Sequence, residues 1–131
     1  MRRLYSGACH CGAVRFEIDA EIDHVRACDC SVCAKRAALI FRVPADAFRL
    51  LTAWDALSVY RWGSMTGAGY FCTICGVLPF RQPSRPTAEE AAAGVEPFLG
   101  WAVNTRCLEG FDPASVPRKH IHGRTLAIQA G

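Results

Sequence analysis

Three cysteines stand within six residues in the segment Cys28-Asp29-Cys30-Ser31-Val32-Cys33. Thiols this close cannot each pack independently in a core, and three soft ligands on one short turn suit a thiophilic divalent metal, above all zinc. Three protein ligands leave one position of a tetrahedral ion open, which distinguishes catalytic zinc sites from closed structural ones. Cys28, Cys30 and Cys33, here called the cysteine triplet, are therefore candidates for an open metal site.

Two further cysteine pairs lie about sixty residues apart, Cys9-His10-Cys11 and Cys72-Thr73-Ile74-Cys75. A glycine follows each pair directly, which lets the chain turn without a Cβ while backbone N–H groups approach the sulfurs. Two such knuckles complete a tetrahedral four-thiolate site of the closed, structural kind. We call Cys9, Cys11, Cys72 and Cys75 the four-cysteine group. The alternative is a redox-active pair at Cys72 and Cys75 with unrelated thiols elsewhere.

The eighth cysteine, Cys107, stands alone in Thr105-Arg106-Cys107-Leu108. Added to the triplet, it would give a second closed metal site. Left out, it would be a buried free thiol, which is common in proteins, and the triplet would stay open. Spacing leaves both arrangements possible.

Eight cysteines in 131 residues indicate either disulfides or metal. The basic N-terminus has no apolar run behind it and does not resemble a secretory signal, and no stretch approaches the eighteen apolar residues of a membrane span. We therefore expect a cytoplasmic protein whose cysteines lie in a reducing compartment, where metal binding is favoured over cystine. No membrane partner is expected.

The bulk composition predicts one globular domain over residues 1–131, because 51% of the residues are apolar and 21% are charged. The formal charge is +3. Seven thiolates on two divalent ions carry three more negative than positive charges, which would bring the loaded protein near neutrality. The mild basicity of the sequence is thus no argument for a nucleic-acid partner.

The cysteine clusters are separated by short segments with β patterns. Val14, Phe16 and Ile18 alternate with charged residues, which predicts a half-buried strand. Residues 45–51 fit either a helical turn or a short strand. Further strands are predicted at 4–8, 24–27, 37–43, 57–62, 68–72, 77–81 and 98–104.

The second half of the chain contains its one shift in composition. Residues 83–97 hold three prolines and an alanine-rich run, which predicts a surface excursion with one helical turn. The tail from residue 109 is loop-like and is expected to end in a strand at 121–128. Many short strands and little helix predict a mainly β fold.

Four segments, in this order and spacing, resemble the glutathione-dependent formaldehyde-activating enzyme (GFA) family, which also includes centromere protein V. They are Cys9-His10-Cys11-Gly12-Ala13-Val14-Arg15-Phe16, the triplet segment, Phe71-Cys72-Thr73-Ile74-Cys75-Gly76 and Val103-Asn104-Thr105-Arg106-Cys107-Leu108. The resemblance implies an Mss4-like β-tent fold of short antiparallel strands around zinc sites. It implies two zinc ions per chain, a structural one on Cys9, Cys11, Cys72 and Cys75 and a catalytic one on Cys28, Cys30 and Cys33.

The same resemblance implies a carbon–sulfur lyase-type activity that joins glutathione and formaldehyde into S-hydroxymethylglutathione, or splits this adduct. The expected partner is thus a small thiol, glutathione. Two other functions remain as alternatives: a carrier that holds a thiol without catalysis, and a two-zinc module that binds protein or nucleic acid. The sequence does not identify the oligomeric state.

Five basic side chains are candidate anchors for the carboxylates of a peptide-like thiol, because a guanidinium can bind a carboxylate through two parallel hydrogen bonds. They are Arg15, Lys35, Arg36, Arg61 and Arg106. Lys35 and Arg36 directly follow the triplet and are the best placed. A solvated surface role is the alternative for each.

Several other polar and aromatic side chains could serve either the site or the fold. His10 is expected near the zinc but unbound, because a side chain between two ligands on an extended knuckle points away. Asp29 is expected to support the triplet or face solvent, and Asn104 to hydrogen-bond at the site rim or end a turn. The remaining candidates are Trp62 and Trp101, as core or pocket wall, and His120 and His122, as surface residues or a metal-binding pair.

Overall fold

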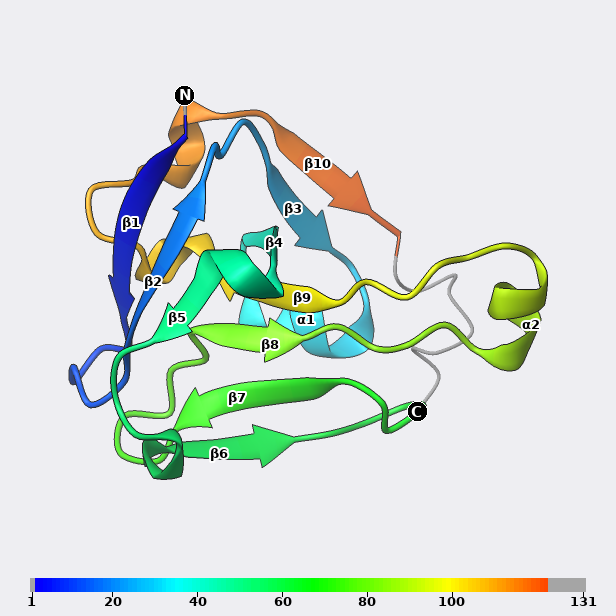
Figure 1. Cartoon of the computed structure of the whole chain (residues 1–131), viewed down its shortest axis with the longest axis horizontal. Helices are drawn as coiled ribbons and strands as arrows, with labels where there is room; N and C mark the ends of the chain where they lie inside the picture. Colours follow the sequence, from blue (N-terminus) through cyan, green and yellow to red (C-terminus); the bar gives the residue numbers. More distant parts are fainter. Residues whose placement is uncertain (1, 123–131) are drawn as a thin grey trace.

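A computed structural model describes residues 2–122 of the chain, and Figure 1 shows its two sheets. A three-stranded antiparallel sheet has the order β1-β2-β5, and a seven-stranded sheet has the order β10-β3-β4-β9-β8-β7-β6. The strands are β1 (Arg3–Ala8), β2 (Arg15–Ala20), β3 (Val25–Cys28), β4 (Ile40–Pro44), β5 (Phe48–Leu50), β6 (Leu57–Tyr60), β7 (Ala68–Cys72), β8 (Phe80–Gln82), β9 (Gly100–Asn104) and β10 (Arg118–Ile121). The expectation of a mainly β fold is confirmed.

The helical elements are short. They are α1 (Ser31–Arg36), α2 (Ala88–Ala92) and the 3-10 turns η1 (Ala45–Ala47), η2 (Trp54–Ala56), η3 (Thr105–Cys107) and η4 (Pro113–Ser115). No helix within residues 2–122 has the length and apolar character needed to cross a membrane. The excursion predicted at 83–97 does contain its helical turn: α2 begins at a capping box formed by Thr87 and Glu90, and Figure 1 shows it projecting from the body.

Besides shifted strand ends, the observed elements differ from the expected ones in three places. Residues 45–51 form both alternatives in succession, η1 and then β5. The triplet segment, read as a turn, leads into the helix α1. In the tail, the strand starts earlier than expected, at Arg118, and it runs parallel to β3. The rest of the strand predicted at 121–128, from residue 123 onward, lies outside the described residues.

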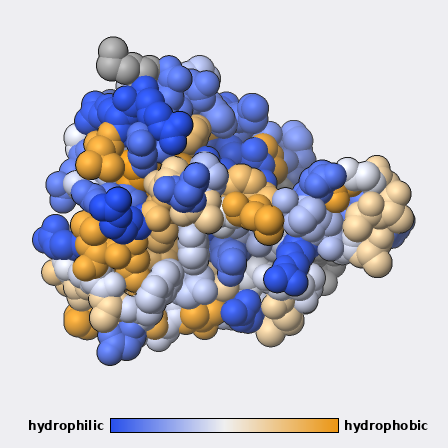
Figure 2. All heavy atoms as spheres, viewed as in Figure 1, coloured by the Kyte–Doolittle hydropathy of each residue, from blue (hydrophilic) through white to orange (hydrophobic). Residues whose placement is uncertain are grey.

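The core lies between the two sheets. The alternation in β2 places Phe16 and Ile18 inside, fully buried, and Phe80 from β8 meets them. The Phe80 ring lies 5.6 Å from the Phe16 centroid, 4.8 Å from that of Phe48 and 5.4 Å from that of Trp101. On the surface, hydrophobic and hydrophilic residues are interspersed over the face in Figure 2, with hydrophilic residues gathered near the start of β1.

The opposite face of the seven-stranded sheet carries a row of directly paired residues from five neighbouring strands. The row consists of Tyr60, Gly69, Arg81, Ala102 and Arg42. Paired residues of neighbouring strands point to the same face of a sheet. We call this set the outer row.

The outer row shares its face with the start of the cysteine triplet. Arg26 on β3 pairs with Ile40, which lies two residues before Arg42 on β4. Because side chains alternate along a strand, Arg26 and Cys28 point to the same face as the outer row. The fold thus places the triplet and three arginines on one side of the sheet.

A buried threonine fixes the turn that follows β9. The Thr105 hydroxyl, fully buried, donates to the Leu39 carbonyl at 2.6 Å, and the Thr105 N–H donates to the same oxygen at 2.8 Å. Thr105→Val keeps the shape but removes the first bond, so it should lower the free energy of unfolding by about 1 kcal/mol. We expect Tm to fall by about 3–5 °C. Thermal denaturation of this variant and of Thr105→Ser, which keeps the hydroxyl, checks the prediction. Equal losses of Tm in the two variants would contradict it.

Candidate metal centres

The four-cysteine group is assembled from the ends of two strands that lie far apart in the sequence. Cys9 and Cys11 follow β1, while Cys72 ends β7 and Cys75 lies three residues later. All four Sγ atoms lie within 4.8 Å of one another, with 3.7 Å between Cys9 and Cys11 and 3.6 Å between Cys11 and Cys72. A tetrahedral zinc ion with Zn–S bonds near 2.3 Å needs sulfurs about 3.8 Å apart. The donor set and its spacing fit a zinc ion.

The backbone around this group has the form of two similar knuckles. Val14 N–H donates to Cys9 Sγ at 3.3 Å, and Ile74 N–H donates to Cys72 Sγ at 3.4 Å. The glycines after the pairs, Gly12 and Gly76, adopt φ of 84° and 78°, a region that favours glycine. These turns aim N–H groups at sulfur, as the glycine positions predict.

The same backbone contacts favour thiolate at one ligand position. Hydrogen bonds from the backbone of Val77 and Cys11 lower the pKa of Cys75 to about 6. A thiol of this kind is largely ionised at neutral pH even without metal, and metal ligation requires the deprotonated form. All eight cysteines lie within residues 2–122 and are free thiols, so the structure contains no disulfide between them.

The triplet is formed by the end of β3 and the first turn of α1. Cys30 is the N-cap of α1, and its Sγ accepts a hydrogen bond from Cys33 N–H at 3.4 Å. Positions three apart lie on one face of a helix, which directs Cys30 and Cys33 toward Cys28. The three Sγ atoms lie within 4.8 Å of one another, with Cys30 and Cys33 buried and Cys28 half-buried. Three clustered thiolate donors of this kind fit a zinc ion.

Crowding keeps protons on the metal-free triplet. A hydrogen bond with the Cys28 side chain, together with burial, raises the pKa of Cys33 above its ordinary value. Metal binding would therefore release protons from this group.

Cys107 lies beside the four-cysteine group. Burial, followed by the charges of Cys9 and Cys75, raises the pKa of Cys107 to about 11, and its Sγ lies 4.0 Å from the Leu78 carbonyl. Within residues 2–122, no fourth Cys, His, Asp or Glu ligand joins the mutual 4.8 Å cluster of the triplet. Of the two arrangements left open by spacing, the structure favours the one in which the triplet is one ligand short.

Four of the five candidate carboxylate anchors are exposed at the surface: Arg15, Lys35, Arg61 and Arg106. Two of these make backbone contacts, since Arg61 Nη1 donates to the Gly67 carbonyl at 3.3 Å and Arg106 Nε donates to the Ala37 carbonyl at 3.3 Å. Arg15 lies 3.9 Å from the Glu109 carboxylate. The fifth, Arg36, is half-buried and faces a pocket.

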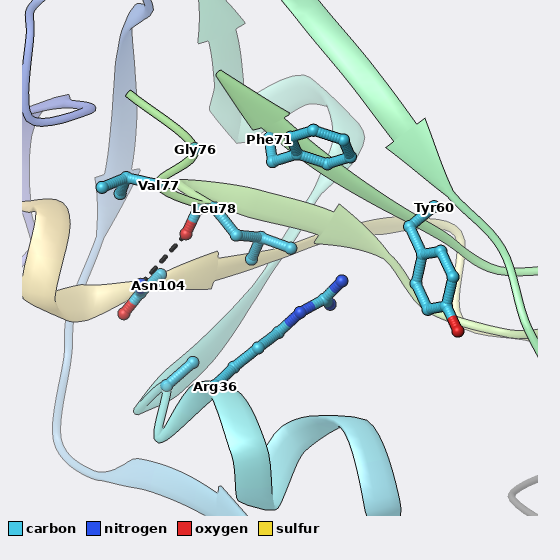
Figure 3. A pocket seen from close by; sticks show the side chains of 8 residues that line it. Arg36, Tyr60, Phe71, Gly76, Val77, Leu78 and Asn104 are labelled. Carbon is cyan, nitrogen blue, oxygen red and sulfur yellow. Dashed lines mark hydrogen bonds between the residues drawn. The ribbon is translucent and has the colours of Figure 1, made fainter. Parts of the chain in front are cut away.

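This pocket, drawn in Figure 3, has a volume of about 480 Å³, within the range of ligand sites. Arg36 reaches into it from the end of α1, three residues after Cys33, and points toward Leu78, Phe71 and Tyr60. The lining residues are Arg36, Ala38, Tyr60, Phe71, Gly76, Val77, Leu78 and Asn104. The triplet itself does not line the pocket. Arg36 relates the two sites, because it belongs to the same helix as Cys33 and its side chain lines the pocket.

The candidate asparagine and tryptophans have mainly structural roles. Asn104 lines the pocket, but its amide donates to the Leu78 carbonyl at 3.0 Å and accepts from Arg106 N–H at 3.2 Å, so it ends a turn. Trp101 packs in the aromatic core, whereas Trp62 stacks on Tyr60 with centroids 5.8 Å apart.

The histidines lie outside both cysteine clusters. His10 is exposed and does not belong to the four-cysteine group. His120 and His122 are exposed on and after β10, and His122 Nδ1 lies 3.8 Å from the Asp29 carboxylate. The arrangement places Asp29 beside the triplet with a histidine partner.

Sequence reasoning missed Arg81, a member of the outer row. Its Nε is buried without a hydrogen-bond partner among the described residues. Burial lowers the pKa of Arg36, a negative charge on Cys33 would raise it, and the charge of Arg81 lowers it further, so the three groups are neighbours. Burial and the charges of Arg26 and Arg81 also lower the pKa of Arg42 to about 10. A positively charged sheet face therefore borders the triplet.

Comparison with known proteins gives a family and a structural neighbour. The family model described as glutathione-dependent formaldehyde-activating enzyme matches residues 4–98. Among solved structures, a crystal structure of a Rhodobacter sphaeroides protein from a structural genomics programme is similar, with a TM-score of 0.70 and 28% sequence identity. The match covers 87% of this chain and 99% of that one.

Proposed function

Because the chain belongs to the glutathione-dependent formaldehyde-activating enzyme family, we propose that it is a zinc-dependent enzyme of carbon–sulfur lyase type. Its substrate would be an adduct of glutathione and an aldehyde, such as S-hydroxymethylglutathione, which it would form or cleave. The observation that carries the proposal is the triplet of Cys28, Cys30 and Cys33. It offers three thiol ligands, no fourth within the described residues, and a neighbouring pocket reached by Arg36.

The two cysteine clusters would have different roles. Cys9, Cys11, Cys72 and Cys75 form a closed ligand set that would hold β1 against β7, whereas the triplet would leave one position for a substrate thiol. A zinc ion bound by the triplet would supply the positive charge that ionises a neighbouring thiol near neutral pH.

The reaction adds a thiol across a carbonyl group. The glutathione sulfur gives up its proton to water and bonds to the aldehyde carbon, while the C=O π pair moves to oxygen, which takes a proton back from water. The reverse reaction breaks the same carbon–sulfur bond. Arg36 and Arg81 add positive charge beside the triplet, which favours an anionic sulfur there.

The experiment must separate catalysis from the spontaneous reaction, since thiols and formaldehyde combine without an enzyme. Exchange between free glutathione and its formaldehyde adduct can be followed by NMR at equilibrium with zinc-loaded protein. We expect the exchange rate to rise in proportion to protein concentration. An exchange rate equal to the spontaneous one, with glutathione still bound, would refute catalysis and indicate that the protein is a thiol carrier.

A second measurement tests thiol ligation directly. In cobalt-substituted protein, thiolate ligands give charge-transfer bands that change when a further thiol enters. We expect glutathione to alter these bands, and S-methylglutathione, whose sulfur is blocked, to leave them unchanged. Identical spectra with and without glutathione would exclude ligation of the substrate sulfur.

A further inference from the structure

Arg36 and Arg81 each carry a buried guanidinium nitrogen, Nη1 and Nε respectively, with no hydrogen-bond partner among residues 2–122. Neither arginine takes part in any ion pair formed within that part of the chain. An unpaired buried charge is costly, and such groups in folded proteins are normally hydrogen-bonded or paired. Each half-buried arginine therefore keeps one buried N–H group that a bound anion would satisfy.

The Arg36 guanidinium is held in place by shape and aromatic rings. It lies over Gly69, where an added Cβ would stand 2.8 Å from Nη1 and 2.9 Å from Nη2. Its central carbon lies 5.9 Å from the Tyr60 ring centroid and 5.6 Å from that of Trp62, within cation–π range. These contacts orient the guanidinium without neutralising it.

Arg81 lies next to Gly69, on the neighbouring strand β8. Gly69 pairs with Arg81 on one side and with Tyr60 on the other, so all three point to the same face of the sheet. The outer row thus places one cation, Arg81, and one aromatic ring, Tyr60, on either side of the space that Gly69 leaves for the Arg36 guanidinium.

The pocket that Arg36 enters has a mostly apolar wall. Of its lining residues only Arg36 is charged, and Ala38, Phe71, Val77 and Leu78 supply hydrocarbon surface. This combination suits a ligand with an uncharged body and an anionic end. A planar carboxylate matches the fork of N–H donors on a guanidinium.

We propose that Arg36, backed by Arg81, binds a carboxylate of the thiol substrate in this pocket, so that the sulfur is presented to the triplet. The proposal rests on the proposed function for the identity of the ligand as a carboxylate-bearing thiol. Arg36 lies three residues after Cys33, about one turn of helix, which places the carboxylate subsite next to the candidate metal site.

The test uses ligands that bind but cannot react. S-Methylglutathione and its diethyl ester both have a blocked sulfur, and only the first carries carboxylates. Calorimetric titration of the metal-loaded protein should show preference for the acid over the ester by about tenfold or more, the usual range for charged hydrogen bonds. Arg36→Gln should abolish the preference by weakening the acid alone.

Two variants sharpen the comparison. Lys35→Gln removes the same charge from the neighbouring, exposed position of α1 and should keep the preference. Gly69→Ala retains Arg36 but displaces its guanidinium and should weaken the acid more than the ester. Circular dichroism and thermal denaturation would establish that each variant is folded.

The main rival is that the two arginines only balance the negative charge of a metal-bound triplet. Arg36→Gln would then lower the zinc content of the triplet while the preference for the acid persists, which overturns the proposal. Preference unchanged in Arg36→Gln with full zinc content also overturns it, as does equal binding of acid and ester by the unmodified chain.

The outcome is independent of turnover. Catalysed exchange without any carboxylate preference would refute the subsite and leave the enzyme in place. A preference abolished by Arg36→Gln, without catalysed exchange, would support the subsite and refute the enzyme.

Discussion

Cys72→Ser is expected to lose one of the two proposed zinc ions per chain and to lower Tm by roughly 15 °C or more. Cys72 is buried at the end of β7, and its sulfur accepts hydrogen bonds from Ile74 and Cys75 while lying 3.6 Å from Cys11. Structural zinc contributes about 10–16 kcal/mol to folding in small zinc modules. For a chain of this size, losing even 4 kcal/mol of that contribution lowers Tm by about 15 °C.

Cys107→Ser is the matched control, because Cys107 lies beside the same group without belonging to it. It should keep both zinc ions and lose only a few degrees. Metal analysis of gently purified protein and thermal denaturation give both readouts. Two retained zinc ions in Cys72→Ser would show that the four-cysteine group is not the structural metal site.

The second large effect is expected at the triplet. Cys28→Ser should retain the fold and one zinc ion, lose the other, and slow the exchange of glutathione with formaldehyde by more than about 100-fold. The reason is that loss of supporting groups around a metal already costs 10- to 100-fold in affinity or activity, and Cys28 is a direct ligand in the proposal. Cys28 is half-buried at the end of β3, so a serine of similar size can occupy its position.

The two cysteine variants should therefore separate stability from activity. Cys28→Ser is predicted to stay folded and become inactive, whereas Cys72→Ser is predicted to unfold at lower temperature. Equal metal loss and equal Tm changes in both would mean that the clusters are not functionally distinct. Full activity of Cys28→Ser would refute the catalytic role of the triplet.

Much of the four-cysteine group could be predicted from the sequence, because its signals are local. Cys9 and Cys11, like Cys72 and Cys75, carry their glycine and their preceding strand with them, and a shared metal site then follows from ligand number. The strands at Arg15–Ala20 and Ala68–Cys72 follow in the same way from short-range patterns.

Helix α1 was harder to foresee, because its N-cap is a cysteine. Caps are usually serine, threonine, aspartate or asparagine, and the sulfur of Cys30 takes that role here. The parallel pairing of β10 with β3 was also hidden, since four residues, Arg118–Ile121, join a strand almost one hundred residues earlier in the chain.

Arg81 could not be recognised for a further reason. It stands at the end of the strand predicted at 77–81, and an arginine at such a position usually faces water. Only the registers of β3, β4 and β6 to β9 reveal that its face lies beside the triplet and the Arg36 pocket. The register between distant strands, unlike the spacing of cysteines, cannot be read from a short stretch of sequence.

The projecting segment between β8 and β9 is a place where the fold can accept insertions. It joins two neighbouring antiparallel strands whose register, with Arg81 opposite Ala102, is set inside the sheet. Its helix α2 is stabilised by its own Thr87–Glu90 capping box. Doubling the length of such a loop costs only about 0.6 kcal/mol of closure entropy. New sequence can thus be grafted there, by evolution or by design, without disturbing either cysteine cluster.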